Sequence, residues 1–343
     1  MDVSADIVIR FGRYRISLYN PHLIFLLSVA ASLALLALER SIGIGWDYHL
    51  DAYTYIEWSK FDQFSIESVL SNFAIWDLAG NAWYYIVNIF NSNVNALIGL
   101  NILVYSITNV TLANFCYKNI DPCSKGVWLL LLLVIFNPYR THLSVHVLKD
   151  TLIIISIVYF FIVPRAYSWL FILLSFFISF RAVLYLVAIF NKKNFIFVLT
   201  PVLLFIFFEP GDFISKLDIL PHTLPSMTFR DYDNVPNFLE LGMLGSIIRV
   251  IVWPLLALSG VFFLISPTVM YLPIAVGALL LQLWCFKKYR KPAFYFQVYL
   301  ALGLFAIVVT GFTTYIRYAV PLITILPILI IKRNSVHFEK YRK

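Results

Sequence analysis

Charged side chains are scarce in this sequence. Asp, Glu, Lys and Arg make up 13% of the 343 residues, whereas hydrophobic residues make up 61%, and the mean hydropathy is +0.84. An ordinary soluble domain carries about 25% charged residues, which keep its surface in solution. The scarcity therefore excludes a typical soluble protein and predicts an integral membrane protein.

Cysteine is also rare. The three residues, Cys116, Cys123 and Cys285, have neither the spacing of a zinc-binding motif nor that of a disulfide framework. In the topology derived below, all three fall at cytoplasmic ends of spans, where a reducing environment keeps them as thiols. The sequence therefore predicts no disulfide scaffold.

Apolar runs recur from residue 22 to residue 331, and no stretch has the composition of a separate soluble domain. The expected fold is therefore a single all-α integral membrane domain over residues 1–343, with about ten transmembrane helices. Their approximate bounds are 22–40, 94–117, 126–138, 149–163, 167–180, 182–191, 194–209, 269–286, 293–311 and 316–331.

Two larger extracytoplasmic loops separate these spans. The first, about 41–93, ends in NAWYYIVNIFN, which is too short to cross a membrane. It predicts an interfacial helix whose aromatic side chains lie at the level of the lipid headgroups. The second loop, about 209–245, is rich in proline. The segment 246–265 is read as re-entrant or interfacial, because a spanning helix would place the basic stretch FKKYRK outside.

The net charge of +8 would suggest a nucleic-acid partner in a soluble protein. In a membrane protein the positions of Lys and Arg set the orientation instead. With both termini in the cytoplasm, most of the 26 Lys and Arg residues lie on the cytoplasmic side. The sequence therefore predicts a multi-pass membrane protein with both termini cytoplasmic, surrounded by membrane lipids and without a nucleic-acid partner.

Several of the remaining basic residues lie within or next to apolar runs on the outer side. Ionisable groups at such depth are costly and usually keep a polar partner or face an aqueous cavity. Guanidinium groups pair bidentately with phosphate oxygens, so these residues predict a site for a phosphate-bearing lipid, with snorkelling to the headgroups as the alternative. The residues are Arg140, Lys149, Arg181, Arg249 and Arg317.

The stretch NPYRTHLSVHVLKD, residues 137–150, places ionisable groups between two apolar runs. His142, His146 and Asp150 follow at intervals of four, so a helix beginning near residue 141 would align them in one stripe beside Lys149. Such a stripe could transfer protons, hold a metal with two His and one carboxylate, or be a polar helix end in water. No cofactor is predicted, and a divalent cation stays an open alternative.

The stretch WDYHLDAYTY follows the first span. Asp47 and Asp51 are four residues apart, so a short helix would hold both carboxylates on one face. Paired carboxylates can bind a divalent cation or raise one another's pKa, which leaves one as a general base toward a sugar hydroxyl; acids that simply face solvent are the alternative. The aromatic residues around them favour a carbohydrate surface: Trp46, Tyr48, Tyr53, Tyr55 and Trp58.

This layout resembles the GT-C class of lipid-linked glycosyltransferases. Within that class, the chain is most similar to the O-antigen and capsule repeat-unit polymerases of the Wzy and EpsG-like group. The likeness rests on GWDYHLDAY, NPYRTHLSVHVLKD, SFRAVLY and the closing TTYIRYAVPLITILPIL, together with the acidic motif after the first span and the late outer loop.

The resemblance implies a protein of the bacterial cytoplasmic (inner) membrane that polymerises undecaprenyl-pyrophosphate-linked oligosaccharides at its outer face, with a flippase and a chain-length regulator as partners. Its implied catalytic residues are Asp47 and Asp51, joined by His146 and Asp150 from the proton-transfer interpretation. The expected substrate-binding residues are His49, Arg140, His142, Lys149, Arg181, Arg230, Arg249, Arg317 and Tyr318.

Three other functions fit parts of this pattern. A GT-C transferase using a polyprenyl-monophosphate sugar would be expected to bind a cation at the Asp47 and Asp51 pair. A lipid or polysaccharide transporter should carry ionisable groups near the bilayer midplane and internal repeats, whereas here the charges collect at one face. A non-catalytic scaffold would tolerate substitution of the candidate residues.

Overall fold

The computed structural model describes residues 8–11, 14–17, 20–61, 64, 81–119, 135–163, 165–179, 248 and 250–256, and the single positions 276, 280, 283, 287, 299, 302, 303, 306, 315 and 319. The chain divides into two compact units. One unit holds Met1–Phe180, Leu280–Gln282 and Thr324–Lys343, and the other holds Arg181–Leu279 and Leu283–Ile323. The single domain expected from the sequence stays a prediction.

The first elements are two short strands, β1 (Val8–Phe11) and β2 (Tyr14–Ser17). They pair antiparallel, with Val8 opposite Ser17 and Phe11 opposite Tyr14. Both strands contain the β-branched and aromatic residues that favour extended backbone. The all-α expectation did not include this hairpin, but the remaining elements of the described residues are helices.

Helix α1 (Pro21–Ser41) begins at a capped N-terminus. The Asn20 side chain accepts hydrogen bonds from the backbone N–H groups of His22 and Leu23 at 2.9 and 3.3 Å, and Pro21 occupies the first turn, where its missing N–H costs nothing. The helix ends before Gly43, whose φ of 82° suits glycine. The span predicted over 22–40 is therefore confirmed as a helix.

The faces of α1 are inverted with respect to a helix of a soluble protein. Its buried positions include the polar residues Ser28, Ser32 and Glu39. Its exposed positions include several leucines, among them Leu33 with 51% of its surface exposed. A contiguous apolar face in water is a liability, whereas lipid accommodates it. The arrangement suits a helix with lipid on one side and protein on the other.

Two helices of the described residues are long and apolar enough to cross a membrane. They are α1 and the part Val94–Cys116 of α5 (Val94–Asn119). The shorter helices α8 (Asp150–Ile162) and α9 (Arg165–Ile178) follow the predicted spans 149–163 and 167–180 closely. The span predicted at 126–138 lies mostly outside the described residues. The predicted spans beyond residue 180 either lie outside them or are described at a few single positions.

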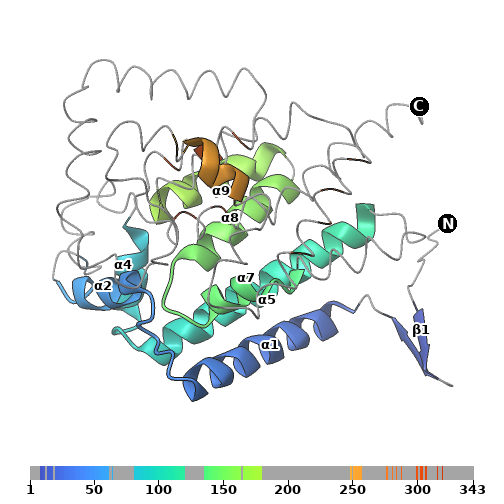
Figure 1. The fold of residues 1–343 in the computed structure, drawn as a ribbon, viewed down its shortest axis with the longest axis horizontal. Helices are drawn as coiled ribbons and strands as arrows, with labels where there is room; N and C mark the ends of the chain where they lie inside the picture. The colour runs from blue at the N-terminus through green and yellow to red at the C-terminus, as the bar shows by residue number, and fades with distance from the viewer. Residues whose placement is uncertain are drawn as a thin grey trace. The chain divides into compact units, whose positions relative to one another are not determined.

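Helices α1 and α5 lie side by side in Figure 1 and run antiparallel. Polar side chains connect them within the apolar interior: Asn109 donates to Ser28 Oγ at 3.1 Å. The short helix α7 (Pro138–Ser144) packs against both, and Ser144 lies 3.1 Å from Ser32 between the hydroxyl oxygens. Buried polar groups of this kind need such partners, so the seam fixes the register of α1 against α5 and α7.

Asn101 of α5 fixes the segment that follows α7. Its Nδ2 donates to the carbonyl oxygens of His146 and Leu148 at 2.7 and 2.9 Å, and its Oδ1 accepts from Thr151 Oγ1 at 2.6 Å. These carbonyls lie in the non-helical turn between α7 and α8, where the backbone has lost its helical partners. One buried amide therefore shapes the connection that carries His146.

Helices α2 (Leu50–Trp58) and α4 (Ala82–Ile89) pack against one another near the start of α5. Helix α4 confirms the short helix predicted from NAWYYIVNIFN. Its aromatic residues do not all lie at a surface, however, because Trp83 and Tyr85 are buried. These two rings pack inside the protein rather than against lipid, and the level of α4 relative to the lipid headgroups stays a prediction.

The second unit is described at few positions. Residues 250–256, orange in Figure 1, are helical. The Trp253 and Tyr315 rings lie 5.2 Å apart between centroids, and the Tyr299 hydroxyl donates to the Ile251 carbonyl at 3.0 Å. Whether 246–265 is re-entrant, as expected, stays a prediction.

Candidate functional site

The helix expected to align His142, His146 and Asp150 is interrupted. Helix α7 ends at Ser144, and α8 begins at Asp150. The single-stripe expectation is therefore wrong, because the turn held by Asn101 separates the three residues. The turn nevertheless folds His146 back toward α7, so that the His142 and His146 rings lie 4.5 Å apart between centroids. Asp150 is buried in the first turn of α8, where the helix dipole favours a carboxylate.

Glu39 joins the two histidines. Its Oε1 lies 2.6 Å from Nδ1 of His142, and its Oε2 lies 3.0 Å from Nε2 of His146. The glutamate is 1% exposed, and a buried carboxylate is stable only when its oxygens are well paired. A carboxylate can only accept, so both ring nitrogens that face it carry hydrogen.

Glu39 was not among the predicted site residues. Its signal in the sequence is a single acid in the last turn of a long apolar run, SLALLALERS. An ionisable residue in such a run is a functional-site candidate by default. The partners of Glu39 are 103 and 107 residues away, so local spacing does not reveal them.

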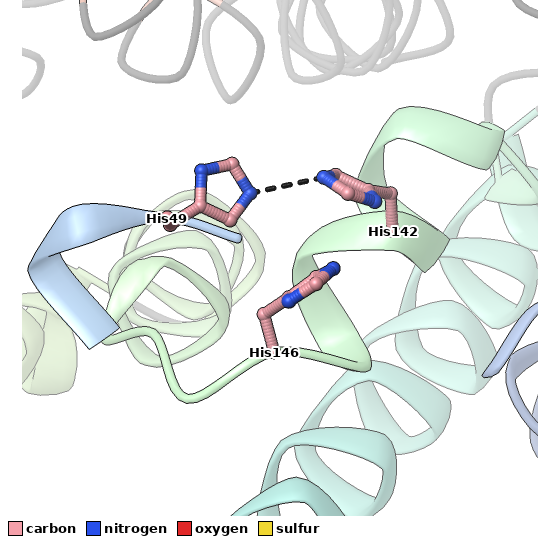
Figure 2. A group of neighbouring side chains, drawn as sticks. All are labelled: His49, His142 and His146. Carbon is pink, nitrogen blue, oxygen red and sulfur yellow. Dashed lines mark hydrogen bonds between the residues drawn. The ribbon is translucent and has the colours of Figure 1, made fainter. Parts of the chain in front are cut away.

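His49 completes the cluster from the segment before α2 (Figure 2). Its Nε2 lies 2.9 Å from Nε2 of His142. Burial lowers the pKa of His142 despite its bond to Glu39, and this direction favours the neutral imidazole. With the His142 proton on Nδ1 toward Glu39, its Nε2 accepts from His49. A hydrogen-bonded chain therefore runs from Glu39 through His142 to His49, which is only partly buried.

The backbone around His49 covers the cluster. The Trp46 carbonyl oxygen lies 3.4 Å from Nδ1 of His146. The partly exposed Tyr48 ring lies 5.2 Å from the His49 ring and 5.8 Å from the His142 ring. The structure thus brings the two stretches that the sequence singled out, WDYHLD and NPYRTHLSVHVLKD, into one site.

The two aspartates do not share a helix face. Helix α2 begins at Leu50, so Asp47 lies in the preceding turn, where its carboxylate folds over Gly45. Asp51 lies in the first turn of α2. The expected carboxylate pair on one helix face is therefore wrong. Burial raises the pKa of Tyr84 on α4, and the negative charge of Asp51 raises it further. Asp51 therefore influences the ionisation of Tyr84.

Aromatic rings from α2, α4 and residue 64 stack on one another. The Tyr84 ring stacks with Trp58 at 6.0 Å and with Phe64 at 4.7 Å between centroids, both nearly parallel. Trp58 keeps 51% of its surface exposed, and Tyr53 is also exposed. Tyr55, from the same predicted aromatic set, is buried, and a carbohydrate-binding surface on α2 stays a prediction.

The basic residues predicted to bind the substrate lie in different surroundings. Lys149 Nζ lies over the Tyr55 ring at 5.6 Å from its centroid, beside the site. Arg140 is 1% exposed; its guanidinium lies over Tyr105 at 5.4 Å, and its Nη1 donates to the Ile135 carbonyl at 3.3 Å. Burial lowers the pKa of Arg140 to about 10, so it is still cationic at neutral pH. The other predicted binding residues lie outside the described residues: Arg181, Arg230, Arg249, Arg317 and Tyr318.

No family model matches the chain, and no curated protein or solved structure is significantly similar to it. The description of the protein therefore rests on its own structural features. Its described part is a largely helical chain, with two helices long enough to cross a membrane and a buried carboxylate that holds two of three clustered histidines.

Proposed function

We propose that the protein is a glycosyltransferase of the bacterial cytoplasmic membrane. In this proposal it polymerises polyprenyl-pyrophosphate-linked oligosaccharide repeat units at the outer face. The observation that carries the proposal is the hydrogen-bonded chain from Glu39 through His142 to His49, located where the membrane-length helix α1 ends. The sequence resemblance described above adds the substrate class.

The reaction needs a base for the acceptor. The acceptor hydroxyl attacks the anomeric carbon, the bond from that carbon to the pyrophosphate oxygen breaks, and the hydroxyl proton passes to a protein group. His49 is the candidate base, because it is the cluster member nearest the surface. Once protonated, its Nε2–H donates to neutral His142, whose Nδ1–H donates to Glu39. The carboxylate therefore stabilises the charge on His49 in the manner of a Ser-His-Asp triad.

Two further groups support binding of the substrate. Trp58 and Tyr53 offer exposed rings whose apolar faces suit sugar rings and whose polar edges can hydrogen-bond. Lys149 supplies a positive charge beside the cluster for the departing pyrophosphate. We assign the same role to Arg181, Arg249 and Arg317, as the resemblance implies. Arg140 is buried over Tyr105, so we do not assign it a direct contact with the pyrophosphate.

The alternative is transfer of one sugar from a polyprenyl monophosphate. It is favoured by the three clustered imidazoles, which could hold the cation expected for that reaction. Dependence of activity on a divalent ion separates this alternative from the metal-free polymerase.

A deletion strain tests the proposal. Loss of a polymerase leaves single repeat units on the final acceptor, which is the expected result. A changed repeat unit would establish the single-sugar transferase, and an unchanged surface polysaccharide would overturn both. Complementation with His49→Ala should fail, whereas His22→Ala should restore the polymer, because His22 lies exposed at the start of α1. Membrane fractions must contain equal amounts of both variants.

A further inference from the structure

We propose that His49, His142 and His146 form a binding site for one divalent transition-metal ion of the zinc type. One ring nitrogen of each histidine lies within 4.8 Å of one ring nitrogen of each of the other two. Figure 2 shows the three rings converging from two segments of the chain, the loop before α2 and the α7 region. Imidazole nitrogens suit zinc, copper, nickel or cobalt rather than magnesium or calcium.

Glu39 is the observation that points to a metal rather than to chance proximity. Histidines that bind metal usually donate the other ring N–H to a carboxylate, which fixes the ring and raises its basicity. Glu39 gives this support to two rings at once, through Nδ1 of His142 and Nε2 of His146. The opposite nitrogens, Nε2 of His142 and Nδ1 of His146, are those not bonded to the carboxylate.

The three ligand nitrogens lie within 4.8 Å of one another, so the rings are close to one another but would still have to move to reach ligand spacing. His49 Nε2 and His142 Nε2 are 2.9 Å apart, whereas two nitrogens of a tetrahedral zinc site are roughly 3.3 Å apart, given zinc–nitrogen bonds of about 2.0–2.1 Å. A metal would thus replace the proton between the two rings after they separate by a few tenths of an ångström. Within the part of the chain that the structure describes, the Nδ1 of His146 faces the Trp46 carbonyl oxygen at 3.4 Å, which is long for a hydrogen bond.

The donor set also predicts the kind of site. Three histidines leave one position of a tetrahedral ion for water or substrate, as in catalytic zinc centres. With an ion bound, His49 would be a ligand and not the base. The metal site therefore fits the single-sugar transferase named as the alternative above, in which the ion would lower the pKa of the acceptor hydroxyl. The metal site itself rests on geometry alone and does not depend on that function.

Metal binding to the full-length protein in detergent tests the inference. The protein is stripped with a chelator, equilibrated with Zn²⁺ or Co²⁺, desalted and analysed for metal by mass spectrometry. We expect about one ion per chain and a visible Co²⁺ spectrum typical of tetrahedral coordination. His49→Ala should abolish stoichiometric binding, and Glu39→Gln should weaken it about 10- to 100-fold. His22→Ala is the matched control and should bind like the wild type.

His49→Cys keeps the test decisive if the alanine variant is unstable. A thiolate can replace imidazole as a ligand, so this variant should retain the ion and gain a sulfur-to-cobalt charge-transfer band, which a purely structural histidine would not produce. Wild-type protein without stoichiometric metal, or His49→Ala with unchanged affinity, would overturn the inference. Bound metal without a polysaccharide phenotype would instead remove the proposed function and leave the metal site standing.

Discussion

Helices α1 and α5 are both long enough to cross a membrane, yet protein covers them very differently. Within their apolar windows, 17% of α1 and 61% of α5 is buried. Helix α5 is central and contacts α1, α7 and α8. Helix α1 instead buries one polar stripe, which contains Ser28, Ser32 and Glu39. The more exposed helix, α1, therefore contains the carboxylate of the site, Glu39. The central helix, α5, contains Asn101, which fixes the backbone around His146.

The largest expected effect comes from the polar stripe of α1. Glu39→Ala removes the acceptor of two buried imidazoles, and breaking such a buried pair costs about 3–5 kcal/mol of unfolding free energy. Glu39→Gln should cost less, because the amide keeps the shape and one acceptor. The measurement is the thermal unfolding midpoint in detergent, together with polymer formation in the complemented deletion strain.

Leu38→Ala provides the matched control for Glu39, because it is the adjacent residue and faces outward. It should lose little stability and restore the polymer. Equal stability of Glu39→Ala and Leu38→Ala would show that the stripe does not hold the histidines.

The second effect concerns the outward face of α1. Leu33→Asp places a charge on the exposed side near the middle of the helix, where lipid contact predicts an insertion cost of about 2.5–3.5 kcal/mol. We expect a marked loss of membrane-integrated protein, measured by carbonate extraction, and near-normal integration of Leu33→Ala. If α1 faced water, the aspartate would be tolerated within about 0.5 kcal/mol, so normal integration would contradict a lipid-facing α1.

The third effect tests α5 as the scaffold. Asn101→Leu leaves the carbonyls of His146 and Leu148 without their donor, and each buried unsatisfied group costs about 1–3 kcal/mol. We expect a lower unfolding midpoint and weaker metal binding, because His146 loses its fixed turn. Leu103→Ala, at an exposed position of the same helix, should change neither. An Asn101→Leu protein with normal midpoint and metal affinity would refute this role.

The sequence predicted those parts of the fold that depend on local pattern. Long apolar runs indicated α1 and α5, and NAWYYIVNIFN indicated α4. The length of an apolar run and the turn residues beside it are local signals, which determine a helix without distant partners. The two polar stretches also contain the three histidines that the structure brings together. His49, His142 and His146 come together as members of the residue set expected at the site.

The errors arose where distant residues decide the local structure. The turn between α7 and α8 depends on Asn101 of another helix, so the four-residue spacing of His142, His146 and Asp150 falsely indicated one continuous helix. Glu39 acquires its role only through partners more than a hundred residues away. The orientation of the chain and the polymerase chemistry stay predictions. Labelling of a cysteine introduced at position 49 with a membrane-impermeant thiol reagent can test the orientation, and the deletion strain can test the chemistry.

The smallest expected effect is a pH dependence of stability. It shows whether burial of His142 on α7 or its bond to Glu39 on α1 dominates the pKa of this histidine. Burial lowers the pKa of His142 below its ordinary value, although the Glu39 bond opposes this effect; the facing titratable groups are Glu39, His146 and His49. As the pH falls through about 6.5, the unfolded chain takes up this proton before the folded protein does. Stability should therefore decrease below that pH and level off once the folded pKa has been passed.

His142→Gln removes the group that titrates, so this acid-side decrease should become shallower in the variant, while His22→Gln should keep the wild-type slope. The measurement is the unfolding midpoint between neutral and mildly acidic pH. An unchanged slope in His142→Gln would mean that other groups set the acid sensitivity. A reversed slope, with the wild type more stable at low pH, would mean that the charge of Glu39 outweighs burial and that His142 is an imidazolium in the folded protein. In that case Nε2 of His142 would carry a proton, so it could neither accept from His49 nor bind a metal, and both chemical proposals for this cluster would fall together.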